Sequence, residues 1–207
     1  GLVRGVLHDL RNPLQLVRGF LATSIRDPQI PEEVTRDLRI AQGAAARAID
    51  LAETLLLADV PERYQPQIEP VDVASVIKSV VAQAVPAAEA AKVTLQANIP
   101  PDLPAAQADH QALYRILDNL VLNAMRHTAG GGKVTIQPDY QDGKVIVQVS
   151  DTGRGMSDDA LQALLHGPLE DAPQGGRLGV WIVRHLVKGM GGELEGSSRP
   201  GGGLSLR

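Results

Sequence analysis

An apolar heptad pattern, interrupted once, runs through the N-terminal part of the chain and limits how that part can fold. Apolar residues alternate steps of four and three over residues 3–21, and the same spacing resumes over residues 34–55. This spacing places one apolar seam along each of two helices. Between them, residues 27–31 (Asp-Pro-Gln-Ile-Pro) break the helix, and Pro31 with the two glutamates after it suits the first turn of a new helix. The sequence therefore predicts a helical hairpin.

The hairpin alone would leave both apolar seams in water. Two helices of this length bury too little surface to form a stable core. Pairing with a second copy gives a four-helix bundle, which hides both seams. We therefore expect a homodimer, and the alternative is a hairpin that packs on the rest of its own chain.

Beyond the hairpin the pattern changes, and we expect a hairpin over residues 1–59, a polar, proline-bearing linker over 60–71 and a second domain over 72–207. Asp142-Gly143 is typical of the turn between two hairpin strands. Helices on one face of a mixed sheet give an α+β sandwich. The predicted helices of the second domain cover residues 73–90, 110–127 and 178–190, and the predicted strands cover 93–97, 133–138, 144–150, 193–197 and 204–206.

The composition excludes several classes of protein. The 207 residues carry a formal net charge of -4, from 20 basic and 24 acidic residues without a basic block, which argues against nucleic acid as a partner. The absence of cysteine excludes disulfides and thiolate metal sites, and the five histidines show no HExxH spacing.

The chain also lacks the apolar run of ~20 residues that a membrane span requires. We therefore expect no membrane contact within this sequence, and a cytoplasmic location. Because the sequence opens inside the heptad pattern, we expect it to belong to a longer protein whose preceding region could anchor it in a membrane.

The first predicted helix carries His8 and Asn12 one turn apart, outside the apolar seam. An exposed neutral imidazole is a good nucleophile near pH 7. Asp9 can accept the other ring proton or help to remove the reacting one, and Asn12 can hold a water molecule beside His8. Pro13 removes one backbone hydrogen bond and bends the helix after this site. These residues alone fit equally well a surface histidine beside a helix kink.

The predicted helix over residues 110–127 has a polar face opposite its apolar stripe. Asn119 and Asn123 lie one turn apart on that face and can present amide oxygens to Mg²⁺, which prefers oxygen ligands. Arg126 and His127 follow and can donate to phosphate oxygens. Two asparagines on a helix are, taken alone, more often a solvated face.

Two glycine-bearing segments follow. Residues 151–156 (Asp-Thr-Gly-Arg-Gly-Met) come directly after a predicted strand. Glycines let the backbone approach a ligand, and the Asp151 carboxylate can accept a hydrogen bond from an adenine amino group. Residues 175–180 (Gly-Gly-Arg-Leu-Gly-Val) open a predicted helix, where unpaired amides and the helix dipole favour phosphate. Each segment alone also fits an ordinary turn or glycine loop.

The segment His8-Asp9-Leu10-Arg11-Asn12-Pro13-Leu14 resembles the phospho-acceptor motif of the largest family of sensor histidine kinases. This resemblance implies that His8 is phosphorylated, that Asp9 aids the transfer and that Asn12 supports dephosphorylation of the partner. The position of the motif, on the first helix of a dimerising hairpin, agrees with that family.

The other three segments resemble, in order, the N-box, the adenine-reading motif and the second glycine box of the superfamily that contains gyrase, the Hsp90 chaperones and histidine kinases. The resemblance implies a domain that binds ATP, with Mg²⁺ at Asn123 and adenine at Asp151. The nucleotide-binding residues that it implies are Asn119, Asn123, Arg126, His127, Asp151, Gly153, Gly155, Gly175, Gly176, Arg177, Leu178 and Gly179.

The chain departs from this pattern at several positions. Arg177 replaces the second glycine of the last box, Val180 replaces a leucine, and Trp181 stands where a small residue is common. The lid segment between Met156 and Gly175 is short and lacks phenylalanine. These departures leave the predicted fold unchanged and bear on how active the domain is.

By resemblance, the chain is the core of a two-component sensor histidine kinase that phosphorylates itself on His8 and passes the phosphoryl group to an aspartate of a response-regulator receiver domain. The alternative is a weak or inactive kinase that acts as a phosphatase or scaffold. An ATP-driven clamp would instead need a large transducer domain and no acceptor histidine. A serine-directed anti-sigma kinase would lack the hairpin motif.

Overall fold

The chain folds as two compact units, Gly1–Tyr64 and Gln65–Arg207. The computed structural model describes residues 13–14, 16–17, 19–27, 29–38, 41–42, 45, 48, 65–167 and 178–207. The predicted linker over residues 60–71 is wrong at its C-terminal end, because Glu69–Val71 form strand β1 of the second unit. The second domain therefore begins before residue 72.

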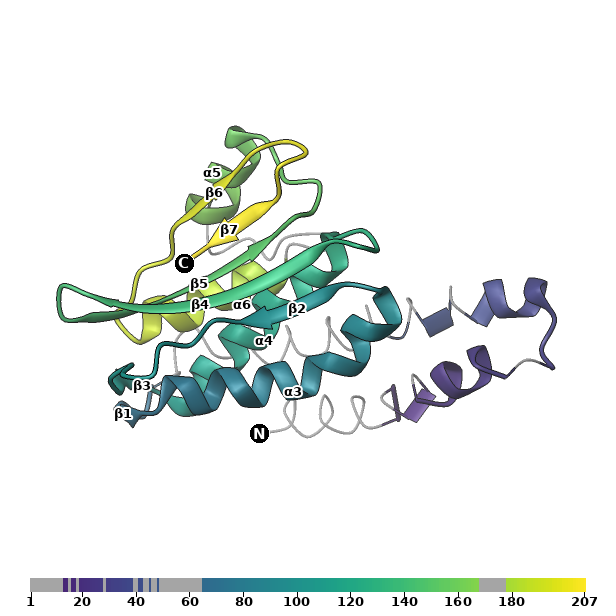
Figure 1. The fold of residues 1–207 in the computed structure, drawn as a ribbon, viewed down its shortest axis with the longest axis horizontal. Coiled ribbons are helices and arrows are strands. Elements are labelled where there is room, and N and C mark those ends of the chain that lie inside the picture. Colours follow the sequence, from purple (N-terminus) through teal and green to yellow (C-terminus); the bar gives the residue numbers. More distant parts are fainter. Residues whose placement is uncertain are drawn as a thin grey trace. The chain divides into compact units, whose positions relative to one another are not determined.

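The described part of the first unit is helical within residues 13–25 and again within 32–48, and residues 26–31 join the two helical stretches (Figure 1). In this connection the Asp27 carboxylate accepts a hydrogen bond from Gln29 N at 2.9 Å, and Pro31 O accepts one from Thr35 N at 2.9 Å, which begins the second helix. The predicted hairpin is thus confirmed in part.

Apolar side chains remain exposed on the first unit. Phe20 is 72% exposed and Leu16 64% exposed. Val17 and Val34, which belong to the predicted seams, are each 46% exposed. Exposure of this kind is what a hairpin awaiting a partner would show, and the homodimer stays a prediction.

The second unit contains a five-stranded mixed sheet with the strand order β2-β4-β5-β7-β6. The pair β2·β4 is parallel, and the other neighbouring strands are antiparallel. A separate two-stranded antiparallel sheet joins β1 to β3. The strands are β1 (Glu69–Val71), β2 (Thr94–Ala97), β3 (Ala106–Ala108), β4 (Lys133–Gln141), β5 (Lys144–Asp151), β6 (Gly196–Ser198) and β7 (Leu204–Leu206).

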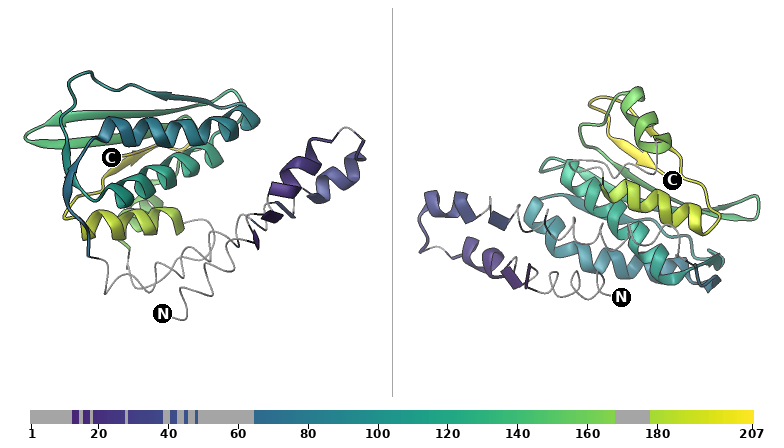
Figure 2. Two further views of the ribbon diagram at one scale, coloured as in Figure 1. Left: turned by 90° about the horizontal axis from the view of Figure 1, so that it is seen from below. Right: turned by 180° about the vertical axis from the view of Figure 1, so that it is seen from behind.

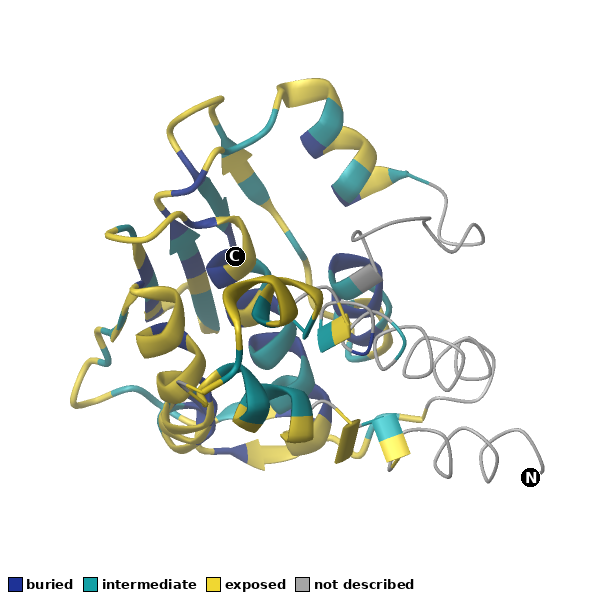
Figure 3. Ribbon diagram, turned by 90° about the vertical axis from the view of Figure 1, so that its right-hand side faces the viewer, coloured by how far each residue is buried: buried dark blue, intermediate teal, exposed yellow. Residues whose placement is uncertain are grey.

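Three helices, α3 (Val73–Ala91), α4 (His110–His127) and α6 (Leu178–Gly189), lie side by side against one face of the sheet (Figures 1 and 2). A shorter helix, α5 (Asp158–His166), packs beside β6 and α6. This arrangement confirms the predicted α+β sandwich. Buried positions lie on the helices and strands of this unit (Figure 3). The buried side chains are largely aliphatic, and the largest fully buried ones include Ile77, Val80, Leu117, Val121, Ile136 and Val183.

Short local signals fix where most elements begin. Asp72, Asp109 and Ser157 each accept a hydrogen bond from the backbone three residues on, and so cap α3, α4 and α5. Asp142 (φ 50°) and Gly143 (φ 81°) turn β4 into β5, because the two-residue hairpin turn needs positive φ at both central positions.

Four elements differ most from the prediction. Strands β1 and β3 and helix α5 were not predicted, and β6 covers Gly196–Ser198 instead of residues 193–197. Helix α5 falls in the segment interpreted as a short lid. Its signal is present in the sequence, since the capping Ser157 precedes two first-turn acids, Asp158 and Asp159, and an apolar stripe.

Asp109 joins three parts of the second unit. It is 9% exposed, and its Oδ1 accepts a hydrogen bond from Ala112 N at 3.0 Å at the start of α4. Its Oδ2 accepts one from Gln67 N at 3.0 Å, just before β1, and its backbone N–H points to the Met190 sulfur, 3.4 Å away at the end of α6.

Helix α3 is long and apolar enough, by length and composition, to meet a simple criterion for a membrane span. Its buried side chains are Val73, Val76, Ile77, Val80, Ala84 and Ala88, at helical spacing. They pack toward β2 and α4, so the apolar character of α3 is that of a core helix.

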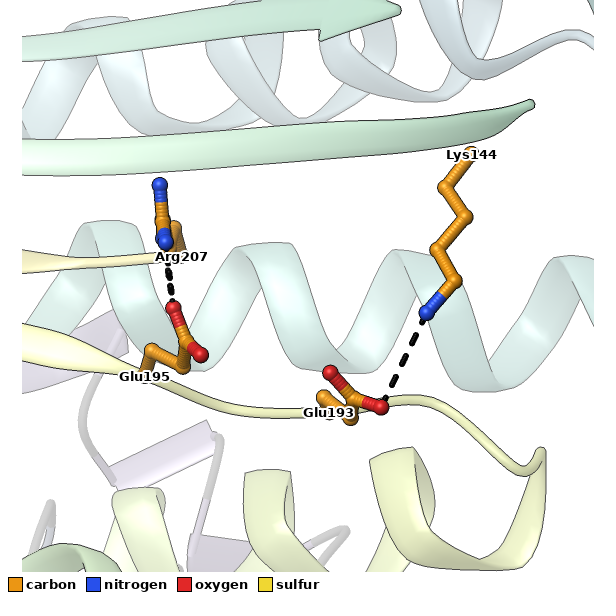
Figure 4. A network of polar contacts seen from close by, with 4 residues as sticks. All are labelled: Lys144, Glu193, Glu195 and Arg207. Carbon is orange, nitrogen blue, oxygen red and sulfur yellow. Dashed lines mark hydrogen bonds and ion pairs between the residues drawn. The ribbon is translucent and has the colours of Figure 1, made fainter. Parts of the chain in front are cut away.

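Two exposed ion pairs tie the C-terminal edge of the sheet (Figure 4). Lys144 Nζ lies 3.7 Å from Glu193 Oε1, and the Arg207 guanidinium donates to Glu195 Oε2 from Nη2 at 2.5 Å. The backbones of Glu195 and Arg207 also exchange two hydrogen bonds of 2.8 Å. Because these side chains are more than half exposed, each pair contributes at most about 1 kcal/mol to stability.

Candidate functional site

A cavity of about 430 Å³ opens among α4, α5, α6 and the strands β5 and β7. Its lining combines a few polar groups with an apolar floor, which is the composition of a small-molecule site. The lining residues are Leu120, Asn123, Ala124, His127, Val149, Asp151, Arg154, Gly155, Met156, Ala160, Leu164, Val180, Leu204 and Leu206.

Helix α4 supplies Asn123 and His127, one turn apart, to this cavity. The adjoining face of the helix, which includes Leu120 and Ala124, is buried, and this fixes the rotation of α4 and so aims these two side chains. Asn119 is not in the lining. Its side-chain N–H₂ donates to Arg115 O within the helix at 2.8 Å, whereas the Asn123 amide makes no hydrogen bond to another described residue. Of the two predicted asparagines, Asn123 is therefore the one open to a ligand.

Gly179, in the first turn of α6, lies against α4. A methyl group at Gly179 would come within 2.6 Å of Asn123 Nδ2 and 3.2 Å of Asn119 Oδ1. Glycine at this position therefore lets α6 approach the two asparagines closely. Val180, the next residue, is 5% exposed and lines the cavity.

Asp151, at the end of β5, is the buried carboxylate of the cavity, with 9% of its surface exposed. Its Oδ1 accepts hydrogen bonds from Gly153 N at 2.8 Å and from Leu204 N at 3.3 Å. No described residue donates to its Oδ2. One carboxylate oxygen is thus held by the protein, and the other is left for a donor in the cavity, because a buried carboxylate needs hydrogen bonds.

Glycines bring two loops together behind Asp151. A side chain at Gly155 (φ +61°) would lie 2.0 Å from Arg199 O, and one at Gly203 (φ +83°) would lie 1.9 Å from Asp151 O. A side chain at Gly153 would meet His127 O at 2.3 Å. The glycines of the predicted adenine motif therefore serve close backbone packing as well as access to the cavity.

His127 and Arg154 meet at the rim of the cavity. Arg154 Nη2 lies 3.4 Å from His127 Nδ1, and both side chains are exposed. Burial lowers the pKa of His127 from its ordinary value, and the charges of Arg154 and Arg126 lower it further, whereas Asp151 opposes them. His127 is therefore neutral at pH 7.

Several predicted site residues lie elsewhere. Arg126 is exposed on α4 and does not line the cavity. His8, Asp9, Asn12, Gly175, Gly176 and Arg177 lie outside the described residues, and Leu178 is described only as the first residue of α6.

Sequence reasoning missed Arg154, although it lies between the two glycines of the predicted adenine motif. It also missed Met156, Leu164, Leu204 and Leu206 as parts of the cavity. The leucines of β7 could not be placed there from local patterns. Trp181, one of the departures from the family pattern, is 6% exposed in α6, and its ring centroid lies 4.0 Å from that of His185.

Among the described residues, no group of three or more His, Cys, Asp or Glu side chains gathers as a metal site. A hard cation in the cavity would be held by the Asn123 amide oxygen together with oxygens of its ligand, as Mg²⁺ is commonly held beside nucleotide phosphates. The unbonded amide of Asn123 fits such a role.

The comparisons with known proteins agree with one another. Residues 108–207 match the family model of the histidine kinase-, DNA gyrase B-, and HSP90-like ATPases. The sensor histidine kinase ZraS of Klebsiella oxytoca is 29% identical over 203 residues, which are 98% of this chain and 44% of that protein. The sensor protein DivL of Caulobacter vibrioides is 32% identical over 208 residues, 99% of this chain and 27% of that protein. The chain spans less than half the length of either relative.

Solved structures show the same fold. The crystal structure of full-length ShkA in complex with AMPPNP has a TM-score of 0.71 at 24% identity and covers 99% of this chain and 44% of that one. The histidine kinase AdeS of Acinetobacter baumannii has a TM-score of 0.63 at 20% identity and covers 96% of this chain and 95% of that one.

Proposed function

Because the chain is a homologue of sensor histidine kinases and its residues 108–207 form a histidine kinase-, DNA gyrase B-, and HSP90-like ATPase domain, we propose that it is the core of an ATP-dependent protein-histidine kinase. One observation carries this proposal. The buried Asp151 carboxylate, with one oxygen held by the protein, faces a cavity that Asn123 and His127 also line.

The cavity binds ATP with adenine at Asp151. The Oδ2 atom accepts a hydrogen bond from the adenine amino group, and the apolar lining, including Met156 and Leu206, covers the base. Guanine offers a carbonyl oxygen in place of that amino group, and two acceptors would repel each other. The structurally similar ShkA was crystallised in complex with AMPPNP, which supports an adenine nucleotide as the ligand.

The triphosphate lies toward Asn123 and His127, and we assign its amide donors to Gly179 in α6 and to Gly175 and Gly176, which precede that helix in the sequence. The Asn123 amide oxygen would hold Mg²⁺, which would supply neutralisation of phosphate charge. We assign Asn119, Arg126, Arg177 and Leu178 to this end of the site as well. Positioning and charge neutralisation do most of the catalysis in such transfers.

The acceptor is His8. Its imidazole nitrogen attacks the γ-phosphorus in line, ADP leaves, and Asp9 takes the ring proton. The phosphoryl group then passes to an aspartate of a response-regulator receiver domain, and Asn12 supports later hydrolysis at that partner. The working unit is a homodimer of the hairpin, in the cytoplasmic part of a longer sensor protein.

The test is autophosphorylation with γ-labelled ATP and Mg²⁺, on the wild type and on His8→Gln and Asn123→Asp. The expected result is acid-labile label on the wild type and its loss in both variants. His8→Gln should still bind ATP, because His8 is not part of the nucleotide site.

A wild type that binds ATP, forms a dimer and takes no label would contradict the kinase proposal. The weak or inactive kinase that works as a phosphatase or scaffold would then be the better reading, and removal of acyl phosphate from a receiver domain, compared with Asn12→Ala, would test it.

A further inference from the structure

Arg154 brings a positive charge to the cavity rim. Its backbone is held in place, since Arg154 O accepts a hydrogen bond from Gly201 N at 2.7 Å. Its guanidinium lines the cavity, and the contact that it makes with a described side chain is the one to His127. No described carboxylate pairs with it. A guanidinium carries donors in a fixed fork that matches phosphate oxygens.

The contact with Arg154 also determines which ring nitrogen of His127 carries the proton. Arginine is always protonated and can only donate, so His127 Nδ1, 3.4 Å from Arg154 Nη2, must be the acceptor. The ring proton of neutral His127 is then on Nε2. His127 Nε2, which Arg154 does not contact, is therefore an N–H donor. The His127 side chain lies one turn from Asn123 along α4, and both line the cavity.

We propose that Arg154 is a phosphate-recognising residue of the nucleotide site, and that its guanidinium also holds His127 in the Nε2–H form so that both residues donate to the same phosphate chain. The inference rests on the proposed ATP site and deepens it. Besides the buried Asp151, the polar side chains that line the cavity are Arg154, His127 and Asn123, and together these three can donate to an anion.

The lowered pKa of His127 agrees with this arrangement. Burial and the neighbouring cations Arg154 and Arg126 keep the ring neutral, against the pull of Asp151. A neutral ring can accept from Arg154 and donate to phosphate at once, whereas a protonated ring would repel the guanidinium.

The first test compares ligands that share the base and differ in phosphate: ATP, ADP and adenosine, each with Mg²⁺, by calorimetry on the full chain. Arg154→Met keeps the aliphatic stem and removes the charge and the donors. We expect about a tenfold loss of ATP affinity and less than about a twofold change for adenosine, since hydrogen bonds to charged groups are among the stronger ones.

Arg154→Lys, which keeps the charge without the fork, should fall between the wild type and Arg154→Met. The matched control is Arg199→Gln in the adjoining loop, whose side chain does not line the cavity and which removes one charge nearby. It should leave the ATP-to-adenosine ratio unchanged. An equal loss for all three ligands in Arg154→Met, or no loss, overturns the phosphate assignment.

The second test needs no ligand. Nitrogen-15 NMR of the His127 ring should show Nδ1 as the unprotonated nitrogen in the wild type, and a mixture of the two tautomers in Arg154→Met. An unchanged tautomer in the variant overturns the positioning role. A wild type that binds neither ATP nor adenosine would contradict the proposed function itself, while the NMR result would still decide how Arg154 acts on His127.

Discussion

The two walls of the cavity are built differently. One wall comes from a single helix, α4, whose Asp109 cap and buried face aim Asn123 and His127. The other wall combines the end of β5 with β7 and the loop before it, segments about 50 residues apart in the chain, and is joined by the hydrogen bond from Leu204 N to Asp151 Oδ1. The helical wall depends on local interactions, whereas the strand wall depends on contacts that form only when the fold is complete.

The difference indicates how each wall responds to mutation. A change on the helical wall alters a side chain that meets the ligand and leaves the helix in place. A change on the strand wall moves backbone, since Gly155 and Gly203 leave no room for a side chain. Binding and stability should therefore separate on the first wall and fall together at the two glycines of the second.

The largest effect is expected for Gly203→Ala. The added carbon would lie 1.9 Å from Asp151 O at a φ of +83°, so the loop must move. Steric overlap and left-handed strain together should lower the free energy of unfolding by roughly 3–5 kcal/mol, measured by urea denaturation. ATP binding should be lost as well.

Gly201→Ala is the matched control in the same turn. Its φ is +74°, but nothing lies within 4 Å of the added carbon, so strain alone should cost about 1–2 kcal/mol. Equal destabilisation by Gly203→Ala and Gly201→Ala would show that close packing behind Asp151 does not stabilise the wall formed by β5 and β7.

Asp151→Asn should show the next largest effect, on binding. The Asn oxygen can still accept from Gly153 N and Leu204 N, but an NH₂ group replaces the second oxygen and opposes the adenine amino group. ATP affinity should fall about 10- to 100-fold in calorimetry, with the unfolding midpoint nearly unchanged. The control is Asp139→Asn, on the exposed part of β4, which should bind ATP as the wild type does. If Asp151→Asn also binds ATP as the wild type does, the Asp151 carboxylate does not recognise the base.

Gly179→Ala tests the helical wall. The added methyl would press on Asn123 Nδ2, which can move, so we expect a three- to tenfold loss of Mg²⁺-ATP affinity, roughly 1 kcal/mol. Stability should hold or rise slightly, because alanine favours a helix more than glycine does. Gly19→Ala, in a helix of the first unit with open space around it, gives the same propensity gain without the binding loss. A destabilised Gly179→Ala protein would contradict the separation between the walls.

The smallest effect is a pH dependence. The pKa values of His127 and His185 are both lowered, and burial is the largest cause. His127 lines the cavity and His185 does not. The unfolded chain therefore takes up these protons first as the pH falls through the ordinary imidazole value of about 6.5. The free energy of unfolding should decline below that pH and be insensitive to these groups above it.

Replacement of either histidine by glutamine should reduce this decline, measured as the difference between urea curves at about pH 7.5 and 5.5. Only His127→Gln should also change the pH dependence of ATP affinity, because phosphate oxygens would raise the pKa of His127. If neither variant changes this decline in the free energy of unfolding, other groups cause the acid sensitivity.

The same contrast between local and long-range interactions explains what the sequence could predict. Helix α4 was predicted with its observed bounds because its cap and apolar stripe lie within 19 residues, and Asp142-Gly143 marked the β4–β5 turn. Strands β1 and β3 are three residues each and exist because they pair across more than 30 residues of chain, so no local pattern signals them.

The site was predictable to the same extent. Asn123, Asp151 and Gly179 were placed by motifs, and the structure brings them to one cavity region. The role of Leu204 in holding Asp151 and the meeting of Arg154 with His127 depend on tertiary contacts. The order of motifs cannot supply either of them.

The two hydrogen bonds of the Asp109 carboxylate limit where this protein can be joined to another in a chimaera. Because Asp109 starts α4 with one oxygen and holds Gln67 N with the other, the segment before β1 is fastened to the helix that carries Asn123. A chimaera that exchanges the input region should therefore cross over before Gln65. A crossover at residue 72 would replace strand β1 and the Gln67 N–H that donates to Asp109 Oδ2.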